Sequence, residues 1–151
     1  MNLKTIEALI PSLLTEVDGR PGFWRGNRGE IPIYVLCDEE HNRLRIMAPI
    51  GELKELDPEF LALLLRANFD RALDAKFSLR GDELWSLFVH PLSTLVSDDL
   101  GIFLDQVVTL VKNTGTTYAS TELVFGLDEN DEEALREYEA GGEEEEEEES
   151  D

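Results

Sequence analysis

The sequence predicts an α+β fold in which an antiparallel sheet of two hairpins carries helices packed on it, followed by a disordered acidic tail. Three observations support this fold class. Apolar residues recur at helical spacing in three segments, two pairs of strand-like runs are joined by short polar turns, and the end of the chain is low-complexity and rich in glutamate. We expect a folded domain over residues 1–127 and a disordered tail over residues 128–151.

The first expected helix covers residues 3–17. Apolar residues recur there at helical spacing from Leu3 to Val17, and Pro11 disturbs the pattern only moderately. The turn-forming residues 18–22 end this helix. We expect a short strand at Phe23–Arg25, before a glycine-containing loop at residues 26–29.

The first predicted hairpin pairs Ile31–Cys37 with Arg43–Ile50 across the polar turn of residues 38–42. In the second of these strands, side chains alternate between the two faces of the sheet. One face receives Leu44, Ile46 and Ala48, and the opposite face receives Arg43, Arg45 and Met47.

The second helix is expected from an N-cap at Asp57 to about Leu73, because an acidic cap followed by proline is a strong helix start. A second hairpin follows, with strands at residues 75–80 and 83–90. Its two-residue turn places Arg80 opposite Glu83, Leu79 opposite Leu84 and Ser78 opposite Trp85.

The third helix is expected to begin with a cap at Ser97 or Asp98 and to continue past Gly115 towards Tyr118. Residues 119–127 are ambiguous in the sequence, since they are compatible with a longer helix, with docking on the domain or with the start of the tail. The complete order is helix, two or three strands, helix, two strands and helix.

Charge is distributed unevenly along the chain. Residues 128–151 hold 15 of the 34 acidic residues and one of the 13 basic residues, so they carry −14 of the net charge of −21. Such a chain repels nucleic acids and anionic membrane surfaces, and neither is an expected partner. Basic proteins are possible partners of the tail. A single cysteine and the absence of a long apolar run favour a protein of the reducing cytoplasm.

No residue pattern in the sequence indicates catalysis. Cys37 and His41 are four residues apart, but a core-facing cysteine and a solvated turn histidine explain them better than a nucleophile or a metal ligand pair. One cysteine and two histidines do not suffice for a closed zinc site. Asp98 and Asp99 fit the start of a helix, and Ser86 lacks a nucleophile motif. We expect no enzyme activity, no metal and no cofactor.

Four stretches of the sequence suggest a family resemblance: Leu63–Asn68, Ala75–Leu79, Glu83–Leu87 and the helix from Ser97. Their order resembles the class I type III secretion chaperones (the CesT-like family) and the related YbjN-like proteins over residues 3–118. The resemblance implies a compact α+β domain, often a homodimer, that holds an extended segment of another protein over its sheet and helices.

Several predicted strands are apolar on both faces, which indicates that a helix, a partner subunit or a bound peptide covers the second face. We therefore expect a non-enzymatic, chaperone-like domain that binds a segment of a partner polypeptide, as a homodimer. A regulatory or sensory module with a small ligand in a pocket beneath the sheet is the alternative. The candidate partner-binding residues are Trp24, Tyr34, Arg43, Arg45, Met47, Trp85 and Leu87.

Two ambiguities accompany these candidates. Trp24 and Trp85 are compatible with a binding surface and equally with the core of the monomer. Arg43 and Arg45 are compatible with pairing to acidic groups of a partner and equally with attraction to the chain's own acidic tail.

Overall fold

A computed structural model describes residues 1–53, 57–70 and 72–114. The chain divides into two compact units, Met1–Lys112 and Asn113–Asp151. The sheet and its helices belong to the first unit. The acidic tail, residues 119–127 and the expected extension of the third helix to Tyr118 lie outside the described residues.

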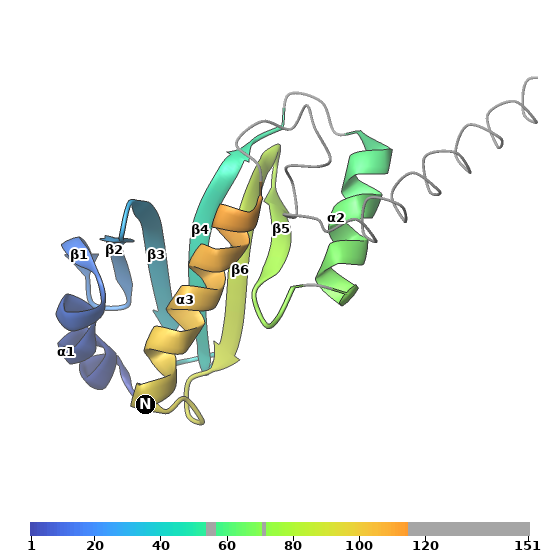
Figure 1. The fold of residues 1–151 in the computed structure, drawn as a ribbon. Coiled ribbons are helices and arrows are strands. Elements are labelled where there is room, and N and C mark those ends of the chain that lie inside the picture. The colour runs from blue at the N-terminus through green and yellow to red at the C-terminus, as the bar shows by residue number, and fades with distance from the viewer. Residues whose placement is uncertain (54–56, 71, 115–151) are drawn as a thin grey trace, which may run out of the picture. The chain divides into compact units, whose positions relative to one another are not determined.

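The predicted fold class is confirmed. Six strands form one antiparallel sheet in the order β1-β2-β3-β4-β6-β5, and three helices accompany it (Figure 1). The strands are β1 (Thr15–Arg20), β2 (Phe23–Arg28), β3 (Ile31–Asp38), β4 (Arg43–Glu52), β5 (Lys76–Arg80) and β6 (Glu83–Pro91). The helices are α1 (Leu3–Leu13), α2 (Pro58–Asp70) and α3 (Ser97–Asn113).

The prediction of one helix over residues 3–17 was wrong in its second part. The helix α1 ends at Leu13, and the edge strand β1 occupies residues 15–20. Leu14 has extended backbone angles and is only 3% exposed, so it continues the apolar pattern of the helix without belonging to it. Every residue of β1 is exposed, so this strand lacks the apolar alternation by which strands are recognised.

The strand β2 is also longer than predicted, since it includes residues 26–28 that the sequence assigned to a loop. Gly26 explains the difference. A Cβ at this position would lie 2.9 Å from the Cβ of Leu14 and 3.1 Å from the carbonyl oxygen of Thr15. Glycine here permits close approach of β1 and α1 to the strand and does not form a turn.

The two predicted hairpins are confirmed, the second with its predicted register. Tyr34 pairs with Met47 across β3 and β4, and Ser78 pairs with Trp85 across β5 and β6. The start of α2 is confirmed as well, because the N–H of Glu59 donates to Oδ1 of Asp57 at 3.0 Å. The helix ends at Asp70, slightly earlier than expected, and α3 begins at Ser97.

One face of the sheet is packed against α1 and α3, which lie in front of it in Figure 1. Ile6 and Ile10 of α1 and Leu104 of α3 are at most 1% exposed within this core. The hydroxyl of Ser86 donates to the carbonyl oxygen of Val107 at 3.0 Å and connects β6 to α3. In the described ranges 1–53, 57–70 and 72–114, no helix is long and apolar enough to cross a membrane.

The helix α2 lies beside β5 at the edge of the sheet (Figure 1). The side-chain amide of Asn68 bonds to both backbone groups of Phe77, donating to the carbonyl oxygen at 3.2 Å and accepting from the N–H at 2.7 Å. The ammonium of Lys76 donates to the carbonyl oxygens of Asn68 and Ala72 near the end of the helix. Two neighbouring polar side chains thereby attach α2 to the edge strand.

Candidate partner-binding face

The face of the sheet opposite α1 and α3 bears a continuous set of apolar and basic side chains. Directly paired residues of antiparallel strands point to the same face, so the registers define its members. Within residues 1–53, 57–70 and 72–114, no helix lies over them. We call this surface the open face, and its members are Phe23, Arg25, Tyr34, Leu36, Asp38, Arg43, Arg45, Met47, Lys76, Ser78, Arg80, Glu83, Trp85, Leu87 and Val89.

An aromatic row crosses the open face from β2 to β6. The rings of Phe23 and Tyr34 are 6.3 Å apart between centroids, and the rings of Tyr34 and Trp85 are 5.6 Å apart at an interplanar angle of 68°. The guanidinium of Arg25 lies 5.6 Å from the ring centroid of Tyr34, within the range of a cation–π contact. These contacts hold the rings in place and leave them only half-buried.

Two adjacent hollows mark the open face. The larger, with a volume of about 500 Å³, is bordered by the aromatic row, Met47 and Leu87, with Arg45 and Arg80 among its lining residues. The smaller, of about 380 Å³, is lined by Leu36, Asp38, His41, Arg43 and Arg45. Arg45 borders both hollows, so they lie next to each other along β4.

The structure brings together six of the seven candidate residues. Tyr34, Arg45, Met47, Trp85 and Leu87 line the larger hollow, and Arg43 lines the smaller one.

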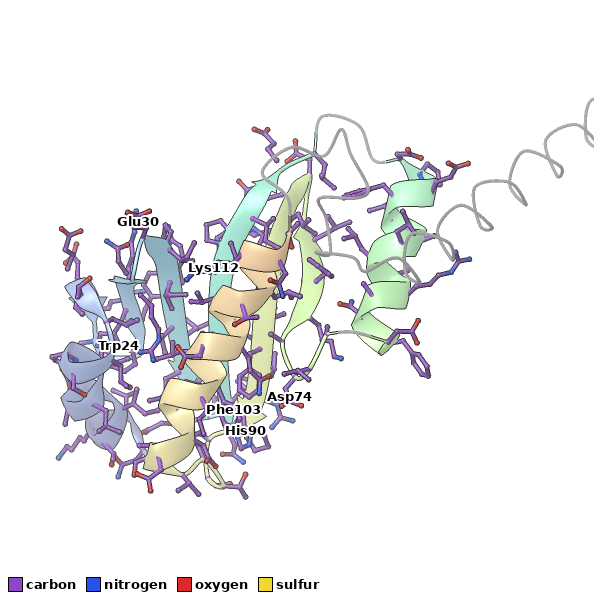
Figure 2. The ribbon with its side chains drawn as sticks, viewed as in Figure 1. Trp24, Glu30, Asp74, His90, Phe103 and Lys112 are labelled. Carbon is purple, nitrogen blue, oxygen red and sulfur yellow. The ribbon has the colours of Figure 1, made fainter. Side chains whose placement is uncertain are left out.

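Trp24 is the exception. It is 5% exposed and belongs to the core cluster, on the α1 side of β2 (Figure 2). The prediction that it joins the binding surface is corrected, because its pairing with Val35 places it on the helix-covered face.

Sequence reasoning missed several members of the open face, notably Phe23, Leu36 and Arg80. Phe23 and Trp24 are adjacent aromatic residues of one strand, so one of them must face the core and the other must not. The sequence does not decide between them. The pairing of Phe23 with Leu36 and of Trp24 with Val35 decides it.

The arginines of the open face are not neutralised locally. In the part of the chain that the structure describes, no carboxylate forms an ion pair with Arg25, Arg43, Arg45 or Arg80. Arg28 offers a contrast, because its Nε lies 2.7 Å from Oδ1 of Asp105. The open face is therefore basic although the chain as a whole carries −21.

The residues weighed for catalysis occupy separate places. Cys37 is 7% exposed in the core, and its burial, followed by the charges of Glu39 and Asp38, raises the pKa of its thiol. His41 is a solvated turn residue bonded to Asp38 at 2.7 Å, and this bond lowers the pKa of that carboxyl. The raised pKa keeps the thiol protonated at neutral pH, so it lacks the thiolate character of a nucleophile.

Ser86 and His90, which lie on the same strand, have structural roles as well. Ser86 is fully buried and its hydroxyl is engaged by α3. His90 stacks on Phe88 and Phe103, with ring centroids 5.9 and 5.4 Å away (Figure 2). Among residues 1–53, 57–70 and 72–114, no group of three His, Cys, Asp or Glu side chains converges as metal ligands would.

A second set of exposed apolar side chains lies on α2, on the segment between α2 and β5, and on β5. Phe69 is 91% exposed, Leu73 73%, Leu65 69% and Leu79 44%. We call these four residues the α2 patch. Next to it is a hollow of about 230 Å³ lined by residues of α2, β5 and β6. Ser78 and Leu79 line both this hollow and the larger hollow of the open face.

Comparison with protein-family models and with curated proteins finds no match. Among solved structures, a chain of the HopA1-SchA chaperone-effector complex is similar, with a TM-score of 0.52 at 12% identity, over 74% of this chain and 95% of that one. A chain of the ExsC-ExsE complex gives a TM-score of 0.49 at 15% identity, over 60% of this chain and 72% of that one. The first likeness supports a secretion-chaperone-like fold, and the YbjN-like resemblance stays a prediction.

Proposed function

We propose that this protein is a non-enzymatic, chaperone-like binding protein that holds an extended segment of a partner polypeptide on its open face. The observation that carries the proposal is the aromatic row beside Met47 and Leu87, on a sheet face that no described helix covers. Half-buried aromatic and methionine side chains are typical of the centres of protein interfaces, where they bury much area at a small entropic cost.

Two further observations support the proposal. The two hollows share Arg45 and lie along β4, so an extended segment laid along this strand would contact both. The solved structure with a TM-score of 0.52 is a complex of a chaperone with an effector, which is an assembly of the proposed kind.

The alternative of a small-ligand module required a pocket beneath the sheet. On that side, core residues such as Ile46 and Leu104 are fully buried and pack together. The hollow of about 500 Å³ opens instead on the opposite face, among side chains that suit a polypeptide.

Site-specific photo-crosslinking tests the proposal. A photoreactive phenylalanine analogue at Leu87 should give a discrete crosslinked product with the partner in cells that make the full chain. The same analogue at Ile102, which is 56% exposed on α3, is the matched control and should not give that product. Mass spectrometry then maps the crosslinked segment. Identical products from both positions, or products from Ile102 alone, would contradict binding at the open face.

We also propose that the protein is a homodimer, joined through the α2 patch. A phenylalanine that is 91% exposed beside three exposed leucines is unusual for a monomer and suits a self-complementary contact. In a two-fold arrangement the patch of one copy covers the same patch of the other, so one small apolar surface suffices on each subunit.

A further inference from the structure

The charge of the open face indicates what kind of segment it binds. We propose that the partner segment is acidic, with an apolar anchor residue flanked by carboxylates. This inference rests on the proposed function and specifies the chemistry of the partner at the same site.

The geometry of the larger hollow is the first argument. Arg45 of β4 and Arg80 of β5 line the same hollow as Trp85 and Leu87. An apolar side chain seated against Trp85 and Leu87 would therefore have guanidinium groups beside it. Carboxylates of the same segment would meet these groups, since guanidinium binds a carboxylate in a two-pronged geometry.

The second argument is that the carboxylates of this region are already engaged. Oδ2 of Asp38 lies 2.7 Å from Nδ1 of His41. Oε2 of Glu83 accepts a hydrogen bond from the indole N–H of Trp85 at 3.2 Å. Arg80 stands directly opposite Glu83 in the sheet register, but neither Arg80 nor Arg45 forms an ion pair with Glu83 or Asp38, so the two guanidinium groups remain available to a ligand.

The net charge of −21 does not exclude an acidic ligand. Exposed charges separated by more than the Debye length, about 8 Å at physiological ionic strength, are largely screened from each other. Contacts within the hollow are much closer than this, so the arginines there outweigh distant carboxylates. The chain's own 15 acidic residues beyond residue 127 have the same chemistry, and they are the competitor that an experiment must separate from a partner.

Fluorescence anisotropy with three labelled twelve-residue peptides tests the inference on the full chain. The peptides repeat two leucines followed by two glutamates, two glutamines or two lysines, so that each face of the extended peptide presents both residue types. We expect the glutamate peptide to bind most tightly and the lysine peptide most weakly. Arg45→Glu and Arg80→Glu should each lower the affinity for the glutamate peptide about tenfold, and Arg45→Gln should lower it less. Lys4→Glu on α1 makes the same charge change at an exposed site and should have no effect.

Leu87→Asp separates failure of this inference from failure of the proposed function. Leu87→Asp could lower the affinity for all three peptides while Arg45→Glu and Arg80→Glu leave it unchanged. This result would overturn the proposal of an acidic partner and leave the proposed function standing. If none of these substitutions changes the affinity for any peptide, both the acidic partner and the proposed function are overturned. Circular dichroism establishes that each variant is folded.

A final arm replaces Glu143–Glu149 with glutamine in the full chain. Tight binding of the glutamate peptide to the unchanged chain supports a separate acidic partner. Binding that appears only after the replacement would show that the chain's own acidic segment occupies the open face, and this would overturn the proposal of a separate partner.

Discussion

At the scale of single residues, Asn68 has a role that its residue type alone does not reveal. An edge strand presents unpaired backbone groups along its outer side. The amide of Asn68 satisfies both backbone groups of Phe77, at 3.2 and 2.7 Å, and so acts as a short substitute for a neighbouring strand. In the sequence, residues 63–68 belong to the second expected helix and to the family resemblance, but a hydrogen bond from a helix to the strand that follows it leaves no periodic signal.

Asn68→Ala should therefore destabilise the protein by about 1–3 kcal/mol, because a partly buried donor and acceptor would lose their partners together. Urea unfolding followed by circular dichroism measures the change. Thr109→Ala, at an exposed position of α3, is the control, and its free energy of unfolding should stay within about 0.5 kcal/mol of the original. An Asn68→Ala protein as stable as the control would show that water replaces the amide at no cost.

At the scale of elements, the meeting of α1, β1 and β2 depends on the absence of a side chain at Gly26. Gly26→Ala would bring a Cβ to 2.9 Å from the Cβ of Leu14 and 3.1 Å from a backbone oxygen of Thr15. We expect a loss of about 1–3 kcal/mol in the free energy of unfolding, since neither of these atoms lies at the end of a flexible side chain.

Gly101→Ala is the matched control in α3, where the added Cβ would lie at an ordinary 3.6 Å from Cδ2 of Leu13. Alanine is the better helix former by up to about 1 kcal/mol, so this change should stabilise the protein. Thermal unfolding of the two variants should give shifts of opposite sign. A Gly26→Ala protein that is no less stable than the original would mean that β1 moves aside readily.

The same region shows what the sequence predicts and what it does not. Strands with apolar alternation, such as β4 and β6, were predicted with their faces, and the register of β6 with β5 was predicted as well. The strand β1 was missed, because its residues are all exposed and Leu14 extends the helical pattern of α1 into the core. A strand held by its neighbour's backbone needs no apolar residues of its own.

The candidate site was likewise predicted where its strands show apolar alternation and missed elsewhere. Tyr34, Arg45, Met47, Trp85 and Leu87 lie on strands whose alternation was readable, and the structure gathers them at one hollow. Trp24 was placed on the wrong face because Phe23 is adjacent to it, and only one of these two aromatic residues can face the core. Arg80 was left out although the predicted hairpin placed it opposite Glu83, because the sequence does not show that β4 lies next to β6, and this pairing brings Arg80 and Arg45 to one hollow.

At the scale of the whole molecule, the two apolar surfaces of the first unit are not independent. Ser78 and Leu79 line the hollow beside the α2 patch and also the larger hollow of the open face. A second copy bound at the α2 patch would therefore border the site proposed for the partner segment. Dimer formation and partner binding should influence each other through the β5–β6 hairpin.

This arrangement leads to a prediction about assembly. Phe69→Asp should convert the protein to a monomer, since it replaces the most exposed apolar residue of the α2 patch, 91% exposed, with a charge at the proposed two-fold contact. Loss of a central aromatic residue from an interface costs about 2 kcal/mol or more, which weakens a dimer by roughly 30-fold. Sedimentation velocity over a range of protein concentrations measures the change.

Ile102→Asp makes a comparable change at an exposed residue of α3, and the dimer should survive it. A monomeric wild-type protein at high concentration, or a Phe69→Asp protein that still dimerises, would contradict the proposed contact. Because the α2 patch borders the open face through Leu79, Phe69→Asp should also alter the affinity for the glutamate peptide, whereas Ile102→Asp should not. A change in that affinity with Phe69→Asp alone would show that the two surfaces act together.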